Sequence, residues 1–160
     1  MDRGVTQSPR DDAWELVLKP HLSPYFVYAA AFIIAAAHVA VGVLLKISPN
    51  SGVIFKTSDQ IGIALVGFVI AGVVLMFARP RVRAGVVGIE VRNVLGPKLI
   101  PWSEVVGVSF PAGAQWARLD LDDYEYEPLM AIQAIDKQRA VDAMDALRGL
   151  VVKYTEPSTA

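Results

Sequence analysis

The stretch YFVYAAAFIIAAAHVAVGVLL, residues 25–45, and the stretch IGIALVGFVIAGVVLMFA, residues 61–78, decide the fold. Neither contains a formally charged residue, and Lys46 and Arg79 directly follow them. A helix needs about 20 apolar residues to cross the hydrocarbon core of a bilayer. The sequence therefore predicts two transmembrane helices, with the second extended to residue 79.

Charge is unevenly distributed around these two stretches. Residues 25–78 hold only three of the 31 charged residues, and the other 106 residues hold 28. Because soluble domains average about 25% charged residues, the chain is an apolar block joined to a polar block of ordinary composition. The formal net charge of −1 argues against nucleic-acid binding through a strong basic field. The absence of cysteine excludes disulfides, thiolate catalysis and cysteine-ligated metal sites.

Basic residues near the two stretches predict their orientation. Residues 46–60 contain a Ser-Pro-Asn-Ser-Gly turn cluster and two basic residues, and we expect them to form an external loop. Basic residues are enriched on the cytoplasmic side of membrane proteins. Seven lie on the opposite side: Arg10, Lys19, Arg79, Arg81, Arg83, Arg92 and Lys98. This count predicts a multi-pass plasma-membrane protein with both termini cytoplasmic: an N-terminal segment 1–24, a domain 80–154 and a tail 155–160.

Small residues recur within the predicted helices. Ala31 and Ala35 in the first, and Gly67 and Ala71 in the second, are four residues apart, a spacing that lets helix backbones approach closely. We favour packing of the two helices within one chain and leave a homo-oligomer open. His38 is the one ionisable residue in a span, and neither span offers it an acidic partner. We interpret it as a neutral imidazole bonded to a helix or carbonyl rather than as a metal ligand or proton relay.

The polar block after the spans predicts a β-rich domain. Residues 81–131 contain short alternating stretches separated by Gly and Pro, which is typical of an antiparallel sheet or a small barrel. In 116–121, WARLDL, alternation places Trp116 on the polar face. Asp136 is the expected N-cap of a C-terminal amphipathic helix. The apolar face of that helix comprises Ala140, Met144, Leu147 and Val151.

Four segments resemble one known family. They are GIEVR (88–92), IPWSEV (100–105), GVSF (107–110) and WARL (116–119). Together with a membrane hairpin in front and a helix behind, they resemble actinobacterial membrane proteins with a small bacterial PH-like domain, the low molecular weight protein antigen 6-like family. The resemblance implies an α+β membrane protein: a two-helix transmembrane hairpin followed by a small antiparallel PH-like β-barrel or sheet with a C-terminal helix. It implies no catalytic residue.

The sequence offers little for an enzyme. No histidine follows residue 79, so a histidine-assisted nucleophile is missing from the polar domain. The acidic residues within 120–127 match no calcium loop, and we interpret them as a solvated face or turn. No glycine-rich phosphate loop is present. We therefore predict a protein that is not an enzyme and has no catalytic residue, cofactor or metal.

Two binding functions remain. We expect a protein-interaction or scaffold module at the inner face of the plasma membrane, with an unidentified protein partner in addition to the lipids around its spans, and no nucleic acid. Trp116 and Trp14 are the candidate interaction residues, and residues 12–22 have the spacing of an interfacial or docking helix.

The alternative is binding of anionic lipid headgroups by the PH-like domain. Its candidate residues are Arg81, Arg83, Arg92 and Lys98. Residues 80–154 hold nine basic and ten acidic residues. Because no basic excess exists, we favour these four residues as topology anchors.

Overall fold

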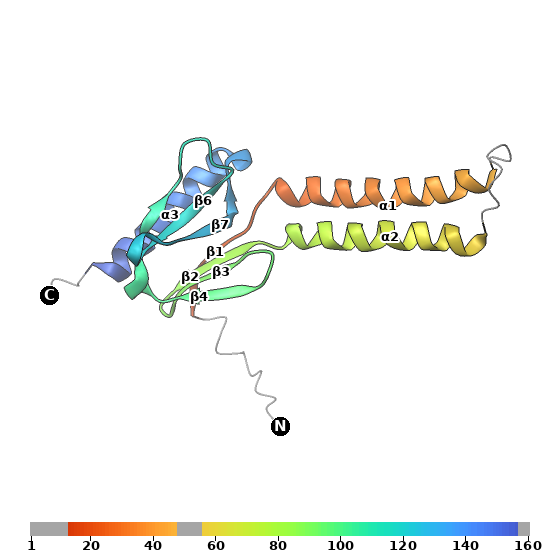
Figure 1. Ribbon diagram of the computed structural model, residues 1–160. Helices are drawn as coiled ribbons and strands as arrows, with labels where there is room; N and C mark the ends of the chain where they lie inside the picture. Colours follow the sequence, from red (N-terminus) through yellow and green to blue (C-terminus); the bar gives the residue numbers. More distant parts are fainter. Residues whose placement is uncertain (1–12, 48–55, 157–160) are drawn as a thin grey trace, which may run out of the picture. The chain divides into compact units, whose positions relative to one another are not determined.

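Figure 1 shows the computed structural model, which describes residues 13–47 and 56–156. The chain divides into two compact units. One is helical and comprises Leu22–Arg79; the other contains the residues on both sides of it, 13–21 and 80–156. The predicted Ser-Pro-Asn-Ser-Gly turn, Arg10 and residues 157–160 of the tail lie outside the described residues.

The helical unit confirms two long apolar helices. They are α1, Ser23–Ile47, and α2, Thr57–Leu75, which the 3₁₀ turn η2, Met76–Ala78, continues. α2 begins four residues before the predicted apolar stretch. Asp59 explains this start, because its Oδ2 accepts a hydrogen bond of 2.8 Å from the backbone N–H of Lys56. A carboxylate in the first turn also complements the positive end of the helix dipole.

Small residues form the contact between α1 and α2. Ala31, Gly42, Gly67 and Ala71 are all buried. A Cβ atom at position 67 would collide with the side chain of His38, so only glycine lets α1 approach α2 this closely. Three of the predicted small residues, Ala31, Gly67 and Ala71, are therefore buried where the two helices pack within one chain, as expected.

Polar groups inside the hairpin are hydrogen-bonded. His38 Nδ1 donates to the carbonyl oxygen of Ile34 at 2.8 Å, which is the carbonyl partner expected from the sequence. Gln60 Nε2 donates to the carbonyl oxygen of Gly42, also at 2.8 Å, and so links the two helices. Pairing matters here because an unpaired polar group in an apolar environment is costly.

The second unit contains two antiparallel sheets and a helix. Sheet A has the order β1-β2-β3-β4, and sheet B has the order β5-β6-β7. The strands are β1 Trp14–Leu18, β2 Arg81–Gly85, β3 Gly88–Arg92, β4 Pro97–Ile100, β5 Val105–Ser109, β6 Trp116–Leu121 and β7 Tyr126–Gln133. The helix is α3, Gln138–Thr155, and short 3₁₀ turns cover Trp102–Glu104 (η3), Asp122–Tyr124 (η4) and Ala134–Asp136 (η5). The predicted α+β class is confirmed, with two sheets in place of a closed barrel.

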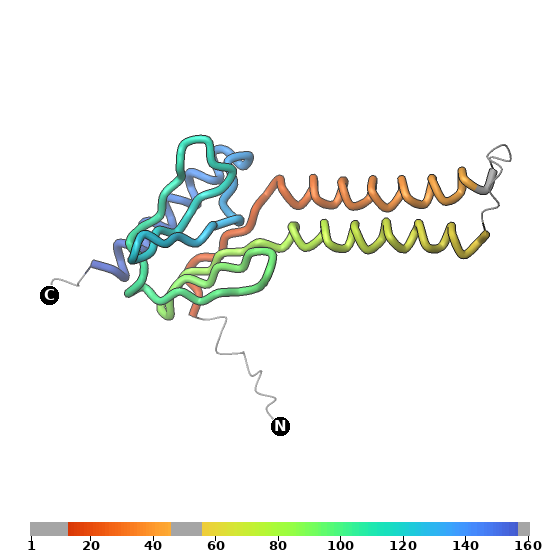
Figure 2. Tube along the Cα trace, in the orientation of Figure 1, coloured from red at the N-terminus to blue at the C-terminus, as the bar shows by residue number. Residues whose placement is uncertain are grey.

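The strand β1 corrects the sequence analysis. Residues 12–22 were expected to form an interfacial helix around Trp14, but residues 14–18 pair antiparallel with β2. Figure 2 shows the red trace of β1 beside the yellow-green trace of β2, although 62 residues (19–80) separate them in sequence. Strand pairing prevails over the helical spacing because Leu16 and Leu18 pack against the core while Glu15 and Val17 are exposed.

One core joins the two sheets and α3. The alternation expected in β3 and β6 is confirmed, because Ile89, Val91, Ala117 and Leu119 are buried. The predicted apolar face of α3 is buried at all four positions. The expected N-cap is wrong: Lys137 precedes α3 with a φ of 49°, and Asp136 lies in η5.

Trp102 closes one end of this core. It is half-buried, and its Nε1 donates to the carbonyl oxygen of Gly85 at 2.8 Å. Its ring stacks on Tyr154 of α3, with centroids 4.9 Å apart. Any side chain at position 85 would collide with the backbone of Ala13. Gly85 thus contacts both the backbone before β1 and the indole of Trp102.

We predict that Gly67→Ala destabilises the hairpin by about 1–3 kcal/mol, because the added methyl group meets His38. Thermal unfolding of the full-length protein in detergent, followed by circular dichroism, measures this. Gly72→Ala is the matched control, since nothing lies within 4 Å of a Cβ there. Equal midpoints for the two variants would contradict the close helix contact.

A second prediction concerns Trp102. Trp102→Ala should cost about 3 kcal/mol, since it removes the stacking on Tyr154 and buried ring area. Trp102→Phe keeps a ring but leaves the Gly85 carbonyl without its donor, and should cost about 1 kcal/mol. Chemical denaturation followed by near-ultraviolet circular dichroism separates the two values. An unchanged midpoint for Trp102→Ala would mean that the ring does not support the core.

Candidate functional site

Three of the four predicted basic residues lie on one face of sheet A. Arg81 and Arg83 alternate with Val82, which is buried, so they point away from the core. Arg81 pairs directly with Arg92 of β3, and Arg83 pairs with Glu90. We call Arg81, Arg83 and Arg92 the arginine face.

The arginine face is incompletely neutralised. Glu90 Oε1 lies 3.9 Å from Arg81 Nη2 and 4.0 Å from Arg83 Nε, both too long for hydrogen bonds. The Nε atoms of Arg81 and Arg83 are buried without a hydrogen-bond partner among the described residues. Like charges directly opposite each other, as in the pair of Arg81 and Arg92, destabilise a sheet. An anion against this face would relieve both conditions.

Lys98 lies apart from the arginine face. It pairs with Val91, whose side chain is buried, so it is on the other side of sheet A. Its Nζ is 3.2 Å from Glu127 Oε2 of β7. Asn93 Nδ2 donates to Glu127 Oε1 at 3.1 Å and to the Pro128 carbonyl oxygen at 2.9 Å. Lys98 therefore helps to join the two sheets.

The two candidate tryptophans belong to different sheets. Trp14 is half-buried in β1, opposite Gly85 of sheet A. Trp116 begins β6 in sheet B and is 40% exposed, on the same polar face as Arg118. They lie in different sheets of the domain, and a binding role for either one stays a prediction.

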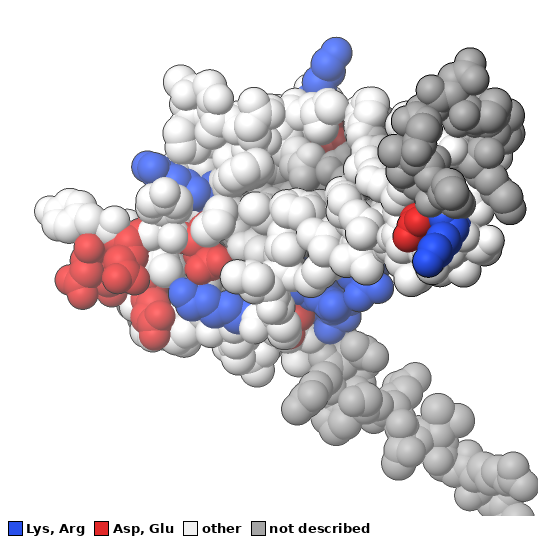
Figure 3. Space-filling model, turned by 45° about the vertical axis from the view of Figure 1, so that its right-hand side comes forward, with Lys and Arg blue, Asp and Glu red and all other residues white. Residues whose placement is uncertain are grey.

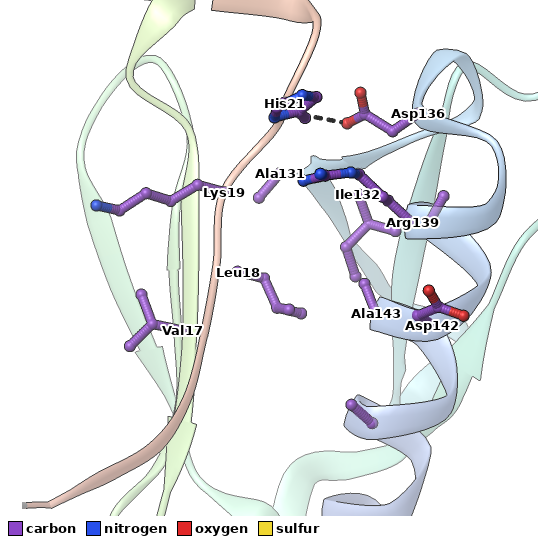
Figure 4. A pocket seen from close by; sticks show the side chains of 12 residues that line it. Val17, Leu18, Lys19, His21, Ala131, Ile132, Asp136, Arg139, Asp142 and Ala143 are labelled. Carbon is purple, nitrogen blue, oxygen red and sulfur yellow. Dashed lines mark hydrogen bonds between the residues drawn. The ribbon is translucent and has the colours of Figure 1, made fainter.

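A pocket of about 310 Å³ lies between β1 and α3 (Figure 4). Leu18, Ile132 and Ala143 supply apolar walls, and the backbone N–H of His21 donates to Asp136 Oδ2 at 3.0 Å. The other lining residues are Val17, Lys19, Ala131, Arg139, Ala140, Asp142 and Ala146, with Asp136 and His21 completing the set. This pocket was not predicted from the sequence, because residues 14–18 were not predicted to form a strand. The alternation of Trp14, Leu16 and Leu18 with Glu15 and Val17 was the available signal.

A polar cluster fastens β1 to the C-terminal part of α3. Glu15 accepts hydrogen bonds from Lys153 Nζ, at 2.8 Å to Oε2, and from the Tyr154 hydroxyl. The hydrogen bond from Lys153, followed by that from Tyr154, lowers the pKa of Glu15. The hydrogen bond to Glu15 raises the pKa of Lys153 and also raises the pKa of Tyr154. Each shift favours the protonation state in which the three side chains are bonded to one another.

An apolar groove of about 300 Å³ lies between Phe110, which follows β5, and α3. Met144 is buried in its floor, and Val141 is half exposed at its side. Lys137 and Arg148 line the groove at positions where both are exposed. We call this feature the α3 groove; Ala134 and Ala140 complete its lining.

The acidic residues of 120–127 form an exposed turn and its flanks. Asp122, Asp123 and Glu125 are exposed, and Figure 3 shows acidic side chains crowded at one end of the visible face. Asp123 and Tyr124 have φ values of 60° and 63°, which fix a tight turn. The part of the chain that the structure describes holds no group of three or more His, Asp or Glu side chains arranged for a metal ion.

Comparisons with known proteins agree on one kind of domain. Residues 79–150 match the family model described as a bacterial PH domain. An uncharacterized protein of Mycobacterium bovis and two of Mycobacterium tuberculosis are each 57% identical over 150 residues, covering 94% of this chain and 96% of theirs. No solved structure matches.

The cluster of Glu15, Lys153 and Tyr154 predicts how stability depends on pH. The folded-state pKa of Glu15 is lowered, so its contribution is complete above its ordinary value of 4.5 and is lost as the pH falls. The pKa of Lys153 is raised, so its contribution is complete below 10.5 and is lost at higher pH. Glu15→Gln should therefore reduce the loss of folding stability at acidic pH, because the variant has no carboxylate at this position to protonate. Midpoints measured from pH 3 to pH 8 test this, and parallel curves for both proteins would contradict it.

Proposed function

Because this chain belongs to the bacterial PH domain family, together with the mycobacterial proteins that match almost its whole length, we propose that it is a membrane-anchored interaction module. Its hairpin spans the plasma membrane, and its PH-like domain binds a protein segment at the inner face. The α3 groove is the observation that carries the protein-binding role.

The surface of the hairpin supports membrane anchoring. Both helices are long and apolar enough to cross a bilayer, and only 11% of the residues in the apolar window of each are buried. Large side chains such as Phe32, Phe68 and Val69 are more than half exposed. A helix in the core of a soluble protein would be mostly buried, whereas lipid tails can cover an exposed apolar surface.

The pairing of β1 with β2 supports a topology with both polar segments on one side. β1 precedes α1, β2 follows α2, and the two strands are neighbours in sheet A. A sheet cannot form across a bilayer, so a hairpin that spans the membrane must return the chain to the side from which it came. The excess of basic residues on this side favours the cytoplasm.

The α3 groove fits a short apolar segment that carries acidic residues. Its floor is apolar, and two basic residues line it: Lys137, and Arg148, whose Nη1 lies 3.4 Å from Asp145 Oδ1. β5, whose end adjoins the groove, forms one edge of sheet B. Peptide-binding domains commonly combine an exposed strand edge with apolar pockets. The hairpin already holds the domain at the membrane, so the groove is free to select a protein.

The polar side chains of the domain support a role without catalysis. The Arg118 guanidinium pairs with Asp120 at 2.8 Å, and its Nε also donates to the Ser109 hydroxyl at 2.9 Å. Glu15 and Glu127, described above, likewise serve contacts between elements. These side chains support the fold, and we propose that the protein is not an enzyme.

Topology can be tested with single cysteines, since the chain has none of its own. We predict that Lys56→Cys reacts with a membrane-impermeant maleimide in intact cells, and that Tyr124→Cys reacts only after permeabilisation. Both positions are exposed in the structure. Labelling of Tyr124→Cys in intact cells would contradict the proposed orientation.

The α3 groove can be tested with two synthetic peptides, one alternating leucine with glutamate and one alternating leucine with lysine. Full-length protein in nanodiscs should bind only the first, and Val141→Glu should weaken it about tenfold, or about 1.4 kcal/mol. Val152→Glu is the matched control, because Val141 and Val152 are 50% and 51% exposed on α3 and only Val141 lines the groove. Equal binding of both peptides, or equal effects of both substitutions, would contradict the proposal.

A further inference from the structure

The turn between β3 and β4 carries an exposed apolar tip. Leu95 is 99% exposed, and Leu99 of β4 is 56% exposed. Val94 and Pro97 extend the same apolar run around Gly96, whose φ of 146° shapes the turn. A single exposed leucine is ordinary. A run of exposed apolar residues at the end of a turn is unfavourable in water unless a partner or a membrane covers it.

Basic residues surround this tip. Arg92 precedes the turn, Lys98 follows it, and Arg81 pairs with Arg92. Continuing the β1–β2 register by one residue places Lys19 beside Arg81. Five basic residues lie in or next to sheet A here: Lys19, Arg81, Arg83, Arg92 and Lys98. Among the described residues, Glu90 lies near Arg81 and Arg83 on the arginine face, and Glu127 pairs with Lys98 on the other side of the sheet. The local charge is therefore positive although the whole domain is slightly acidic.

The chain enters sheet A directly from the helical unit. Only Arg79 and Pro80 separate η2 from Arg81, the first residue of β2. Because Arg92 lies directly opposite Arg81, the β3–β4 turn begins at the strand end where the chain leaves the helices.

We propose that the β3–β4 tip inserts into the surface of an anionic bilayer. Leu95 and Val94 would enter the interfacial layer, and the surrounding Lys and Arg side chains would contact lipid phosphates. This combination of apolar and basic groups suits an anionic membrane surface, since apolar side chains enter the interfacial layer and basic side chains are attracted to anionic lipids. The phosphates would also supply an anion for the incompletely neutralised arginine face.

The proposal rests on the membrane anchoring described above but not on the α3 groove. The insertion would convert a domain on two short tethers into one with a third point of attachment. It requires no pocket for a particular headgroup, so the contact should depend on the anionic fraction of the bilayer and not on one lipid.

Environment-sensitive labels on single cysteines test the insertion directly. Full-length protein with Leu95→Cys carries a nitrobenzoxadiazole label in nanodiscs of phosphatidylcholine, with or without phosphatidylglycerol. We expect a blue-shifted emission and quenching by spin-labelled lipid when phosphatidylglycerol is present. Adding Arg92→Gln, which removes one of the surrounding charges, should reduce both effects.

Two control positions separate the outcomes. Tyr124→Cys places the same label at a fully exposed position in the acidic turn, where we expect emission as in water. Phe68→Cys places it on the exposed apolar surface of α2, where lipid should quench it in every bilayer. Quenching at Phe68 but not at Leu95 would overturn the insertion and leave the anchoring intact. No quenching at Phe68 would overturn the anchoring and the insertion together. A protected label at Leu95 that depends on protein concentration and not on lipid would show self-association and also overturn the proposal.

Discussion

The pairing of β1 with β2 is the constraint on which the rest of the structure depends. These neighbouring strands are the two ends of an insertion that contains the whole helical hairpin. Through this pairing Leu16 and Leu18 reach the core, Gly85 meets the backbone of Ala13, and Glu15 reaches Lys153 and Tyr154. The hairpin is consequently an insertion within the domain, and the domain is complete only when the segments before and after the hairpin pair with each other.

This arrangement changes what a PH-like domain must do for itself. Under the proposed anchoring, a domain joined to the membrane hairpin through two neighbouring strands has a high local concentration at the bilayer, so weak contacts suffice to orient it. The arginine face and the β3–β4 tip belong to sheet A, whereas the α3 groove belongs to sheet B and α3. The proposed contacts with lipid and with protein would therefore use different parts of the domain.

The sequence predicted the elements whose signals are local. Unbroken apolar runs indicated both helices, and strict alternation in 116–121 placed Ala117 and Leu119 in the core. It failed where a distant partner decides the structure, as in β1, whose five residues fit a helical spacing almost as well as a strand. The site shows the same limit. Four basic residues within 81–98 were treated as one set, yet the pleat of sheet A places Lys98 beside Glu127 and leaves the three arginines together on the other face. Burial of the α3 face needed no such partner and was predicted at every position.

The insertion of the hairpin between β1 and β2 has a consequence for synthesis of the protein. β1 leaves the ribosome before either helix exists, and it cannot pair until the 62 residues that follow it have been made and β2 has emerged. Under the proposed topology, a nascent chain that integrated only one helix would leave β1 and β2 on opposite sides of the bilayer with the sheet unfinished. Completion of the cytoplasmic fold would thus report that the membrane segment has been inserted correctly, and a mis-inserted chain would display an open sheet edge to the quality-control proteases of the cell.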